Sequence, residues 1–542
     1  MSYKNIKEPN YNNHYNLYQM CLPLNLEYVL DEDDELFSFL KAIGGIDFSR
    51  YMKKNETRGR KGHDNFRMLK AILFAYMQHG KPSLRKMEDL CAHDVRYIWL
   101  TEEKKPSFMA FERLITEYLI ADIDEIFYDI TFHLVSKMDL STENMYIDGT
   151  KVEAYANKNS FVYKNTILTN MKKMFSNMTE DIILLNQEFG YDFRYGGDYC
   201  AQEIGYISQY LMEVINSQEI DVCYGKGHRK SALQKHMDKF ISYHERQSGY
   251  EYWLDVIGND RNSCSKTDHD ATMCCTKMDY YCNTGLSRPC YNLQIGVSDG
   301  LIVNAGLFQR AGDVKTFIPF MERYREYRGT LPLNPMADAA YGSMENYLYC
   351  CANGMNPVMK YQNYARKNTA KFRKKKFDAL NWETDDAGHK ICPDGRVFSE
   401  YVGDSCSEKS GILQIRQLYR EKDHCRNCQM RKECLSLKKK KGDSDDGGYR
   451  TIGKNVAAEE LHRYVDETLS SEFGKNLKKL RSVMAEGAFG VLKEDRGFTR
   501  FSRRGLDNAK MEFLLVCLGF NLRKYHHWYR KKCKEKVKSL SN

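Results

Sequence analysis

Residues 291–307 decide the expected fold; they read Tyr291-Asn-Leu-Gln-Ile-Gly-Val-Ser-Asp-Gly-Leu-Ile-Val-Asn-Ala-Gly-Leu307. The runs Tyr291–Val297 and Leu301–Leu307 are rich in the apolar residues that favour strands. Between them stands Asp299-Gly300, a pair suited to a two-residue turn. The stretch therefore predicts an antiparallel hairpin.

Segments on both sides of the hairpin predict an α/β fold. Met145–Gly149 is a short apolar run ended by glycine, as in a buried strand, and Pro335–Asp338 predicts a buried strand that ends in an acid. Asp313–Arg325 and the distant Asn476–Lys493 predict helices. Phe513–Leu522 is apolar and fit to cover a sheet. Together these elements describe an α/β core that two insertions interrupt.

The residues before this core predict helices. Apolar residues recur at helical spacing over Phe66–His79, and further helices are expected at Leu84–Cys91 and Ser107–Leu119. Basic residues on the polar faces fit a DNA-binding helix-turn-helix variant, and an ordinary helical bundle is the alternative. We divide the chain into a helical, DNA-binding N-terminal domain (1–140), a first part of the core (141–360, with a helical insertion at about 165–250), a basic cysteine-containing insertion (361–465), a second part of the core (466–525) and a basic tail (526–542).

Basic residues gather in clusters along the chain. Its 82 Lys and Arg exceed its 73 Asp and Glu, which gives a net charge of +9 over 542 residues. Clusters lie at 360–376, at Lys438–Lys441 and at 523–538. They suit a polyanion such as a phosphate backbone, because each neutralised phosphate releases counterions; a solvated surface is the alternative. Arg58–Lys61 fits insertion into a minor groove or a flexible loop.

Features of both ends of the chain bear on its compartment. The opening residues Met1–Glu8 are polar and lack the apolar core of a signal peptide. The longest apolar run, Phe513–Gly519, is far too short to span a membrane. These features argue against a secreted or a membrane protein. We expect a cytoplasmic, nucleoid-associated protein whose 18 cysteines are reduced.

Three acids are candidates for a metal centre: Asp148 and Asp338 at predicted strand ends, and Glu486 on a helix. Carboxylates are ligands that Mg²⁺ and Mn²⁺ prefer. Two such ions, roughly 3.5–4 Å apart, serve phosphodiester displacement. The alternative is a set of surface or helix-capping carboxylates. Glu153 and Asp313 compete for the role, although Asp313 also fits as N-cap of the helix after it.

A cysteine cluster in the second insertion is a candidate zinc site. Cys425-Arg-Asn-Cys428 is a Cys-x-x-Cys pair, with Cys392 before it and Cys434 after it. Four such thiols can form a tetrahedral zinc site. Cys406 is an alternative fourth ligand, and free thiols in a loop are the alternative to zinc. The adjacent pairs Cys274-Cys275 and Cys350-Cys351 have poor chelating geometry and are expected to pack.

The sequence segments around the three acids resemble the motifs of insertion-sequence DDE transposases, in the IS4-like superfamily and most closely its "eleven-eighty-two" group. The resemblance runs from about residue 58 to about residue 525 and follows the family's order. It is carried by Met145–Ala154, by Asn262–Asp268 with Pro289–Gln294, by Ala337–Tyr347, and by Arg481–Lys493 continued in Gly497–Phe501 and Arg504-Gly505.

The resemblance implies a transposase of a bacterial insertion sequence with an RNase H-like catalytic core. Asp148, Asp338 and Glu486 would hold Mg²⁺ or Mn²⁺, and Lys493 would contact DNA beside the glutamate. Arg481 and Arg504 are further candidates for DNA binding. The implied partners are double-stranded DNA, as terminal inverted repeats and target, and further copies of the chain in a homodimer or higher oligomer. A non-catalytic DNA-binding regulator and a metal-dependent nuclease without strand transfer are the alternatives.

Helical geometry predicts which residues share a helix face with Glu486. Glu486 and Lys493 are seven positions apart, two α-helical turns, so we expect them on one face. Arg481 falls off that face by the same geometry. The family's arginine four positions before the glutamate is replaced by Ser482.

Overall fold

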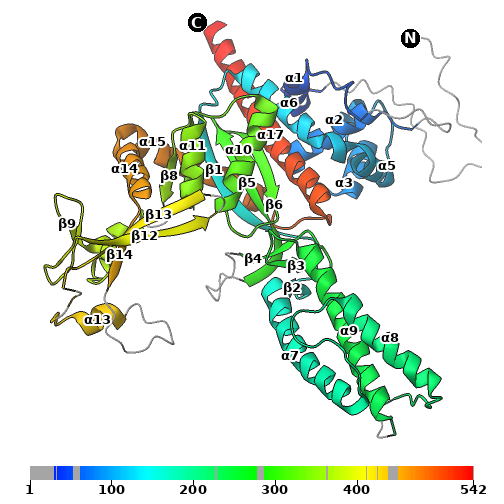
Figure 1. The fold of residues 1–542 in the computed structure, drawn as a ribbon. Coiled ribbons are helices and arrows are strands. Elements are labelled where there is room, and N and C mark those ends of the chain that lie inside the picture. The colour runs from blue at the N-terminus through cyan, green and yellow to red at the C-terminus, as the bar shows by residue number, and fades with distance from the viewer. Residues whose placement is uncertain are drawn as a thin grey trace, which may run out of the picture.

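The structure, a computed structural model, contains both helices and mixed sheets and so confirms the α/β class (Figure 1). The basic stretches Arg58–Lys61 and Lys438–Lys441 lie outside the residues it describes. The described residues are 30–31, 33–52, 62–225, 229–276, 286–361, 364–409, 412–423, 425, 427–436 and 450–540.

A mixed sheet of six strands lies at the centre of the molecule (Figure 1). Its order is β4-β5-β1-β7-β8, and β6 also pairs with β5. Strands β1, β4 and β6 run antiparallel to β5, whereas β1 and β8 run parallel to β7. The strands are β1 (Asn144–Glu153), β4 (Thr272–Thr276), β5 (Leu286–Ser298), β6 (Leu301–Phe308), β7 (Asn334–Gly342) and β8 (Val358–Tyr361).

The predicted hairpin is confirmed as β5 and β6. Asp299 and Gly300 between them have φ angles of 44° and 89°. Both lie in the left-handed region that a type I′ turn requires, which explains why this pair connects the strands. Side chains of the hairpin are buried almost throughout, from Cys290 to Gly306.

The expectation that Asp148 and Asp338 end their strands is wrong. Asp148 is the fifth of ten residues in β1, and Asp338 the fifth of nine in β7. Strand β1 continues because the long β5 pairs with it as far as Glu153, opposite Cys290. The paired positions of β1 and β7, however, end at Tyr146 and Met336. Each aspartate therefore lies just beyond the point where its parallel pairing stops.

The helices expected at Phe66–His79, Leu84–Cys91 and Ser107–Leu119 are present, with Ser107 as an N-cap. They share one hydrophobic cluster with the sheet and with the C-terminal helix α17 (Leu506–Leu540). The elements before the sheet are α1 (Glu35–Ile43), α2 (Asn65–His79), α3 (Leu84–His93), α4 (Val95–Leu100), α5 (Phe108–Arg113), η2 (Leu114–Leu119) and α6 (Ile120–Met138).

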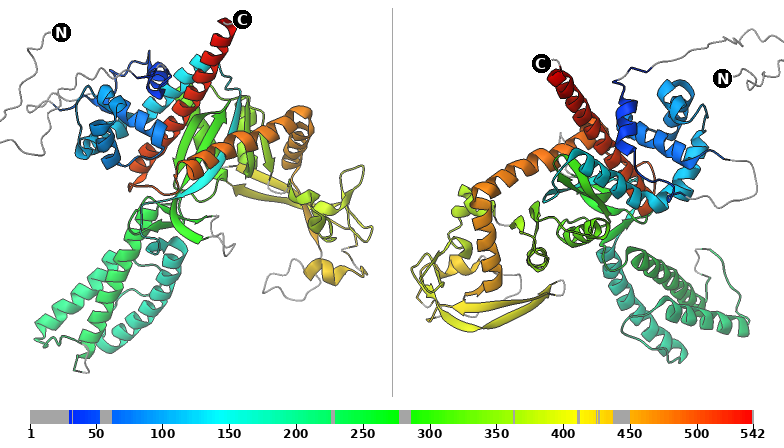
Figure 2. Two further views of the ribbon diagram at one scale, coloured as in Figure 1. Left: turned by 180° about the vertical axis from the view of Figure 1, so that it is seen from behind. Right: turned by 90° about the horizontal axis from the view of Figure 1, so that it is seen from above.

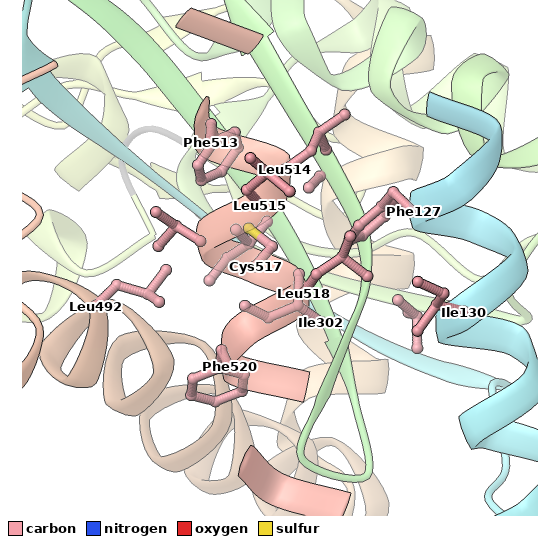
Figure 3. Packing of buried hydrophobic residues seen from close by; sticks show 14 of the residues in the cluster. Phe127, Ile130, Ile302, Leu492, Phe513, Leu514, Leu515, Cys517, Leu518 and Phe520 are labelled. Carbon is pink, nitrogen blue, oxygen red and sulfur yellow. The ribbon is translucent and has the colours of Figure 1, made fainter. Parts of the chain in front are cut away.

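Helix α17 covers the sheet, as predicted for Phe513–Leu522. Figure 3 shows Leu518 of α17 near Ile302 of β6 and near Phe127 and Ile130 of α6. The buried Asn521 binds the backbone of β6: its Oδ1 accepts from the N–H of Ile302 at 2.8 Å, and its Nδ2 donates to the carbonyl of Ile302 at 2.9 Å.

The first insertion is helical, as expected, and extends away from the sheet as an arm (Figure 2). Its helices pack around a hydrophobic cluster of their own, which includes Met178, Leu211 and Phe240. The arm comprises β2 (Phe161–Tyr163), α7 (Lys164–Phe189), α8 (Ala201–Ser217), α9 (Ala232–Ile257) and β3 (Ser263–Ser265).

The second insertion contains an antiparallel hairpin of two long strands, β12 and β13, with shorter strands and helices, and Figure 1 places it beyond β8. Helices α10 and α11 come before β8 in the chain, and α14 and α15 follow the second insertion after β14. The remaining elements are η3 (Val314–Thr316), α10 (Phe317–Arg328), α11 (Met344–Ala352), η4 (Arg366–Asn368), α12 (Ala370–Arg373), η5 (Ala379–Asn381), β9 (Glu383–Thr384), β10 (Lys390–Ile391), β11 (Val397–Phe398), β12 (Glu400–Lys409), β13 (Ile412–Arg420), α13 (Arg431–Ser436), β14 (Thr451–Lys454), α14 (Val456–Ser470), α15 (Glu472–Arg481), η6 (Ser482–Glu486), α16 (Gly487–Gly490) and η7 (Val491–Asp495).

Replacing Asn521 tests the seam between α17 and the hairpin. Asn521→Ala leaves the N–H and carbonyl of Ile302 unpaired in the core, so the free energy of unfolding should fall by about 2–3 kcal/mol. Urea unfolding followed by circular dichroism measures the change. The exposed Lys524→Ala on the same helix should alter stability by less than about 0.5 kcal/mol. An Asn521→Ala variant as stable as wild type would contradict the role of this contact.

Candidate active site

Asp148 and Asp338 lie near each other on neighbouring strands. Asn144 pairs with Asn334 and Tyr146 with Met336, an offset of 190 residues (334 − 144 = 190), and pairing ends there. Both aspartates come two residues after the last paired position, and the charge of Asp338 raises the pKa of Asp148. Adjacent strands lie about 4.8 Å apart, and residues in register share a face of the sheet. Both aspartates are half-buried.

Glu486 reaches the same place from a helix that lies over the sheet. Arg481 joins the groups: its Nη2 donates to Glu486 Oε1 at 2.7 Å, and its Nη1 to Asp148 Oδ1 at 3.5 Å. The Ser482 hydroxyl donates to Glu486 Oε2 at 2.8 Å. Two of the three acids named from the sequence therefore bind one guanidinium group, and the charge of the third, Asp338, acts on Asp148, although all three are far apart in the chain.

The expectation that Arg481 falls off the face of Glu486 is wrong. Residues Ser482–Glu486 wind as a π-helix, in which the hydrogen bonds run from residue i to i+5. Positions five apart then line up, which places Arg481 over Glu486. In a regular α-helix the two residues would point about 140° apart. The π turn is thus what turns the arginine toward the acids.

The electrostatics of Asp148 indicate that the acids act on one another. Burial raises the pKa of Asp148 from 3.8 to about 6, and only 19% of its side chain is exposed. The Arg481 guanidinium lowers this pKa, whereas the charges of Asp338 and Glu486 raise it. A carboxylate held in this way is poised to accept a cation.

The donor set matches Mg²⁺ or Mn²⁺, which prefer carboxylate oxygens. In the described part of the chain, however, no group of three or more His, Cys, Asp or Glu side chains stands close enough together to hold a metal ion. Arg481 lies between Asp148 and Glu486 and binds both. For these two acids to share an ion, the guanidinium must first turn away.

Lys360 is a neighbour of the acids that the sequence did not single out. It follows the last regular pair of β7 and β8, Ala337 with Met359, and precedes the next pair, Gly342 with Tyr361. Burial lowers the pKa of Lys360, with further lowering by Arg481 and Lys478 and the opposite effect from Asp338 and Glu486. The charge pattern of the sequence identified Lys360 only as part of the basic stretch 360–376. Its closeness to the acids depends on contacts between residues far apart in the chain.

A buried polar network supports the sheet beneath the acids. Asp313 Oδ1 accepts from Lys151 at 2.7 Å, from Asn292 at 2.7 Å and from Gln294 at 3.0 Å. Asp313 occupies the N-cap position of η3, as expected, but its side chain makes no capping bond there. Gln294 also accepts from the Tyr341 hydroxyl. Tyr341 is buried at 1% exposure, which agrees with a core aromatic.

Glycine is required at position 149 by this network. A Cβ there would lie 2.5 Å from Gln294 Nε2 and 2.7 Å from the Tyr341 hydroxyl. Both groups are buried and hydrogen-bonded to each other, so neither can move aside easily. The glycine after Asp148 thus allows the strand to approach these side chains.

Lys493 and Arg504 contact β1 and the loop after it. Lys493 donates to Thr150 Oγ1 and to the carbonyl of Lys151, and both of these residues belong to β1. Arg504 is exposed, donates to the carbonyl of Tyr155 at 3.0 Å and lies 5.3 Å from the centre of its ring. These contacts place both cations along the strand that carries Asp148.

Glu153, the competing acid, has other partners. Its Oε1 lies 3.5 Å from Arg500 Nε and 3.8 Å from Lys158 Nζ. It stands five residues beyond Asp148 on β1, so it points to the opposite face of the sheet. The structure therefore does not bring Glu153 together with Asp338 and Glu486.

Four cysteines of the second insertion line one cavity: Cys392, Cys425, Cys428 and Cys434. Burial raises the pKa of Cys425, and the charges of Glu421, Cys392 and Cys428 raise it further. Cys406, the alternative ligand, is exposed on β12 and is not part of this lining. Of the adjacent pairs, Cys274 and Cys350 are buried as expected, whereas Cys275 and Cys351 are exposed.

Comparison with known families gives one match. Residues 391–526 match the family model described as "Transposase DDE domain". This match supports a DDE transposase, and it covers Glu486, Arg481, Lys493 and Arg504 but neither aspartate. Searches of curated proteins and of solved structures gave no match. Among the described residues, none of the helices is long and apolar enough to cross a membrane.

Neutralising Asp148 tests the burial of its charge. With EDTA present at pH 8, Asp148→Asn should raise the free energy of unfolding by up to about 3 kcal/mol, because a pKa about two above the ordinary value makes ionisation that costly. The gain should shrink as the pH falls below 6 and vanish below 3.8, where folded and unfolded carboxyl groups are both protonated.

Thermal unfolding across this pH range measures the effect. The exposed Asp507→Asn serves as the matched control and should change nothing. If Asp148→Asn were less stable than wild type at pH 8, pairing with Arg481 would outweigh burial.

Proposed function

We propose that the chain is a DDE transposase of a bacterial insertion sequence, of the IS4-like superfamily and its "eleven-eighty-two" group. The observation that carries the proposal is the pairing of β1 with β7 just before Asp148 and Asp338, with Glu486 joined to Asp148 through Arg481. The match of residues 391–526 supports it independently. The central sheet supports an RNase H-like core, with three antiparallel strands, β6-β5-β1, followed by the parallel β7 and β8.

The proposed reaction is cleavage of a strand at the end of the element and transfer of the freed 3′-hydroxyl onto target DNA. Asp148, Asp338 and Glu486 would hold Mg²⁺ or Mn²⁺, which supplies activation of the attacking oxygen and stabilisation of the leaving oxygen. The chain's own part is to hold the three carboxylates on a rigid sheet and helix. Precise separation matters because in-line displacement requires fixed positions for both oxygens.

Cations beside the acids would bind the reacting phosphate. Arg481 and Lys360 are half-buried around the acids, and Lys478 acts on the pKa of Lys360. A phosphate is a better partner for a planar guanidinium than water is, because two of its oxygens accept two parallel N–H bonds at once. Arg481 turning from Asp148 to the phosphate would free that carboxylate. DNA binding and opening of the acid site would then be coupled.

Further DNA contacts are proposed along the same edge of the molecule. Lys493 and Arg504 lie along β1 and the loop after it. The basic tail and the N-terminal helices would bind double-stranded DNA as terminal repeats or target. We propose assembly on DNA as a homodimer or higher oligomer, in the cytoplasm on the nucleoid.

Removing Asp338 tests the proposed chemistry. Asp338→Ala should reduce Mg²⁺- or Mn²⁺-dependent nicking at least 100-fold while DNA binding in a gel-shift assay stays within twofold. The substrate is duplex DNA taken from both flanks of the gene, and Asp507→Asn is the matched control. Cleavage that persists in Asp338→Ala would remove the three acids from consideration.

The products distinguish the alternatives. Wild-type protein inactive in both metals would favour a DNA-binding regulator. Nicking without any joined product would favour a nuclease.

Replacing Lys360 tests the phosphate contact. Lys360→Met keeps the length and burial of the side chain but removes its charge, so nicking should fall about 10–100-fold. Raised salt should weaken the difference in DNA binding between variant and wild type, because a phosphate contact is electrostatic. Lys172→Met, at an exposed lysine of α7, should cleave like wild type. Unchanged nicking by Lys360→Met would exclude the contact.

A further inference from the structure

The described residues of the segment 366–454 bury very few hydrophobic side chains. Among the described residues of this segment, the buried hydrophobic side chains are Phe372, Trp382 and Phe398. None of its described residues belongs to the three hydrophobic clusters of the molecule. Small units with so little buried apolar surface usually depend on disulfides or a metal ion. The described cysteines form no disulfides.

The four cysteines converge on one small cavity. Cys392 follows β10, Cys425 and Cys428 follow β13, and Cys434 lies on α13. All four line a cavity of about 30 Å³, together with Trp382 and Phe398. Segments that are more than 30 residues apart in the sequence therefore meet at thiols beside two of the three buried aromatic residues.

Tight turns present the thiols. Cys425 and Asn427 have φ angles of 56° and 61°; asparagine tolerates this left-handed region, whereas it costs the cysteine about 1–2 kcal/mol. Glu421 accepts from the N–H of Cys425 at 2.7 Å and fixes this turn. A second turn places the N–H of Gly395 on the carbonyl of Cys392 at 2.9 Å. Strained turns of this kind persist where the surroundings require them.

A buried cation points at the same sulfur cluster. Arg450 is 8% exposed, and its Nη1 donates to Cys434 Sγ at 3.0 Å. Its Nε is buried and has no hydrogen-bond partner in the structure. A buried guanidinium requires a compensating negative charge. Four neutral thiols supply none, whereas four thiolates around a divalent ion carry a net charge of −2.

We propose that Cys392, Cys425, Cys428 and Cys434 bind one Zn²⁺ ion that holds residues 366–454 together. Four thiolates form the closed, tetrahedral set of a structural zinc site, with Zn–S distances of about 2.3 Å. The sulfur atoms line the cavity without standing close enough for three of them to hold an ion, so side-chain rotation must complete the site. On binding, each thiol loses its proton, and four protons leave for one ion bound.

The metal content of the purified full-length chain tests the proposal. Inductively coupled plasma mass spectrometry should find about one zinc per chain. Cys425→Ser and Cys428→Ser should each lower this content at least fivefold, whereas the exposed Cys406→Ser should keep it. Zinc retained in the first two variants, or absent from the wild type, would overturn the proposal.

A second measurement covers variants that fail to fold. Wild-type protein exchanged into Co²⁺ should show thiolate-to-cobalt charge-transfer absorption and a lower melting temperature after chelation. Absence of both effects would also overturn the site. Zinc content should be unchanged in Asp338→Ala, so the outcome is independent of the proposed transposase chemistry.

Discussion

Burial of the Asp148 carboxylate close to two further acids is the constraint on which this site depends. Asp148 and Asp338 lie on adjacent strands, and Glu486 approaches from above, so their charges disfavour one another. Such groups stay together only where the backbone fixes them and a cation offsets the repulsion. Arg481 supplies that cation within the chain. The sheet, the π turn and the helices that cover them are arranged around this balance.

Two sets of buried contacts make the sheet rigid around the acids. The hairpin β5–β6 is buried nearly throughout and is tied to α17 by Asn521. Beneath β1, the network around Asp313 satisfies the buried donors of Lys151, Asn292 and Gln294. A fully bonded polar network of this kind resists distortion more than an apolar contact, because each displaced group loses a hydrogen bond. The aspartates are thus fixed from below as well as along their strands.

Local sequence signals predicted the elements but not their relations. The hairpin at Asp299-Gly300, the N-cap at Ser107 and the buried face of α17 all follow from neighbouring residues, and the structure confirms them. The length of β1 did not follow, because pairing with β5 extends it.

The surroundings of three residues did not follow from the sequence. The side chain of Asp313, at its N-cap position, accepts from three donors instead of capping, Arg481 is turned by a π segment, and Lys360 lies near the acids. Each depends on contacts between residues far apart in the chain or on a change of helical winding. Sequence periodicity assumes regular helices and contacts between near neighbours. It therefore carries no information on long-range contacts or on a change of helical winding.

The family match and the strand register support different parts of the proposed triad. The match covers residues 391–526 and so reaches Glu486 alone among the three acids. Asp148 and Asp338 depend instead on the pairing of β1 with β7, which involves no residue of the matched range. Arg481 connects the two, because it belongs to the matched range and binds Asp148 outside it. A chance match at the C-terminal end would give no reason for that helix to bring a glutamate to a pair of aspartates on the central sheet. Arg481 therefore links the matched range to one of the two aspartates, which favours the proposal that the three acids form one site.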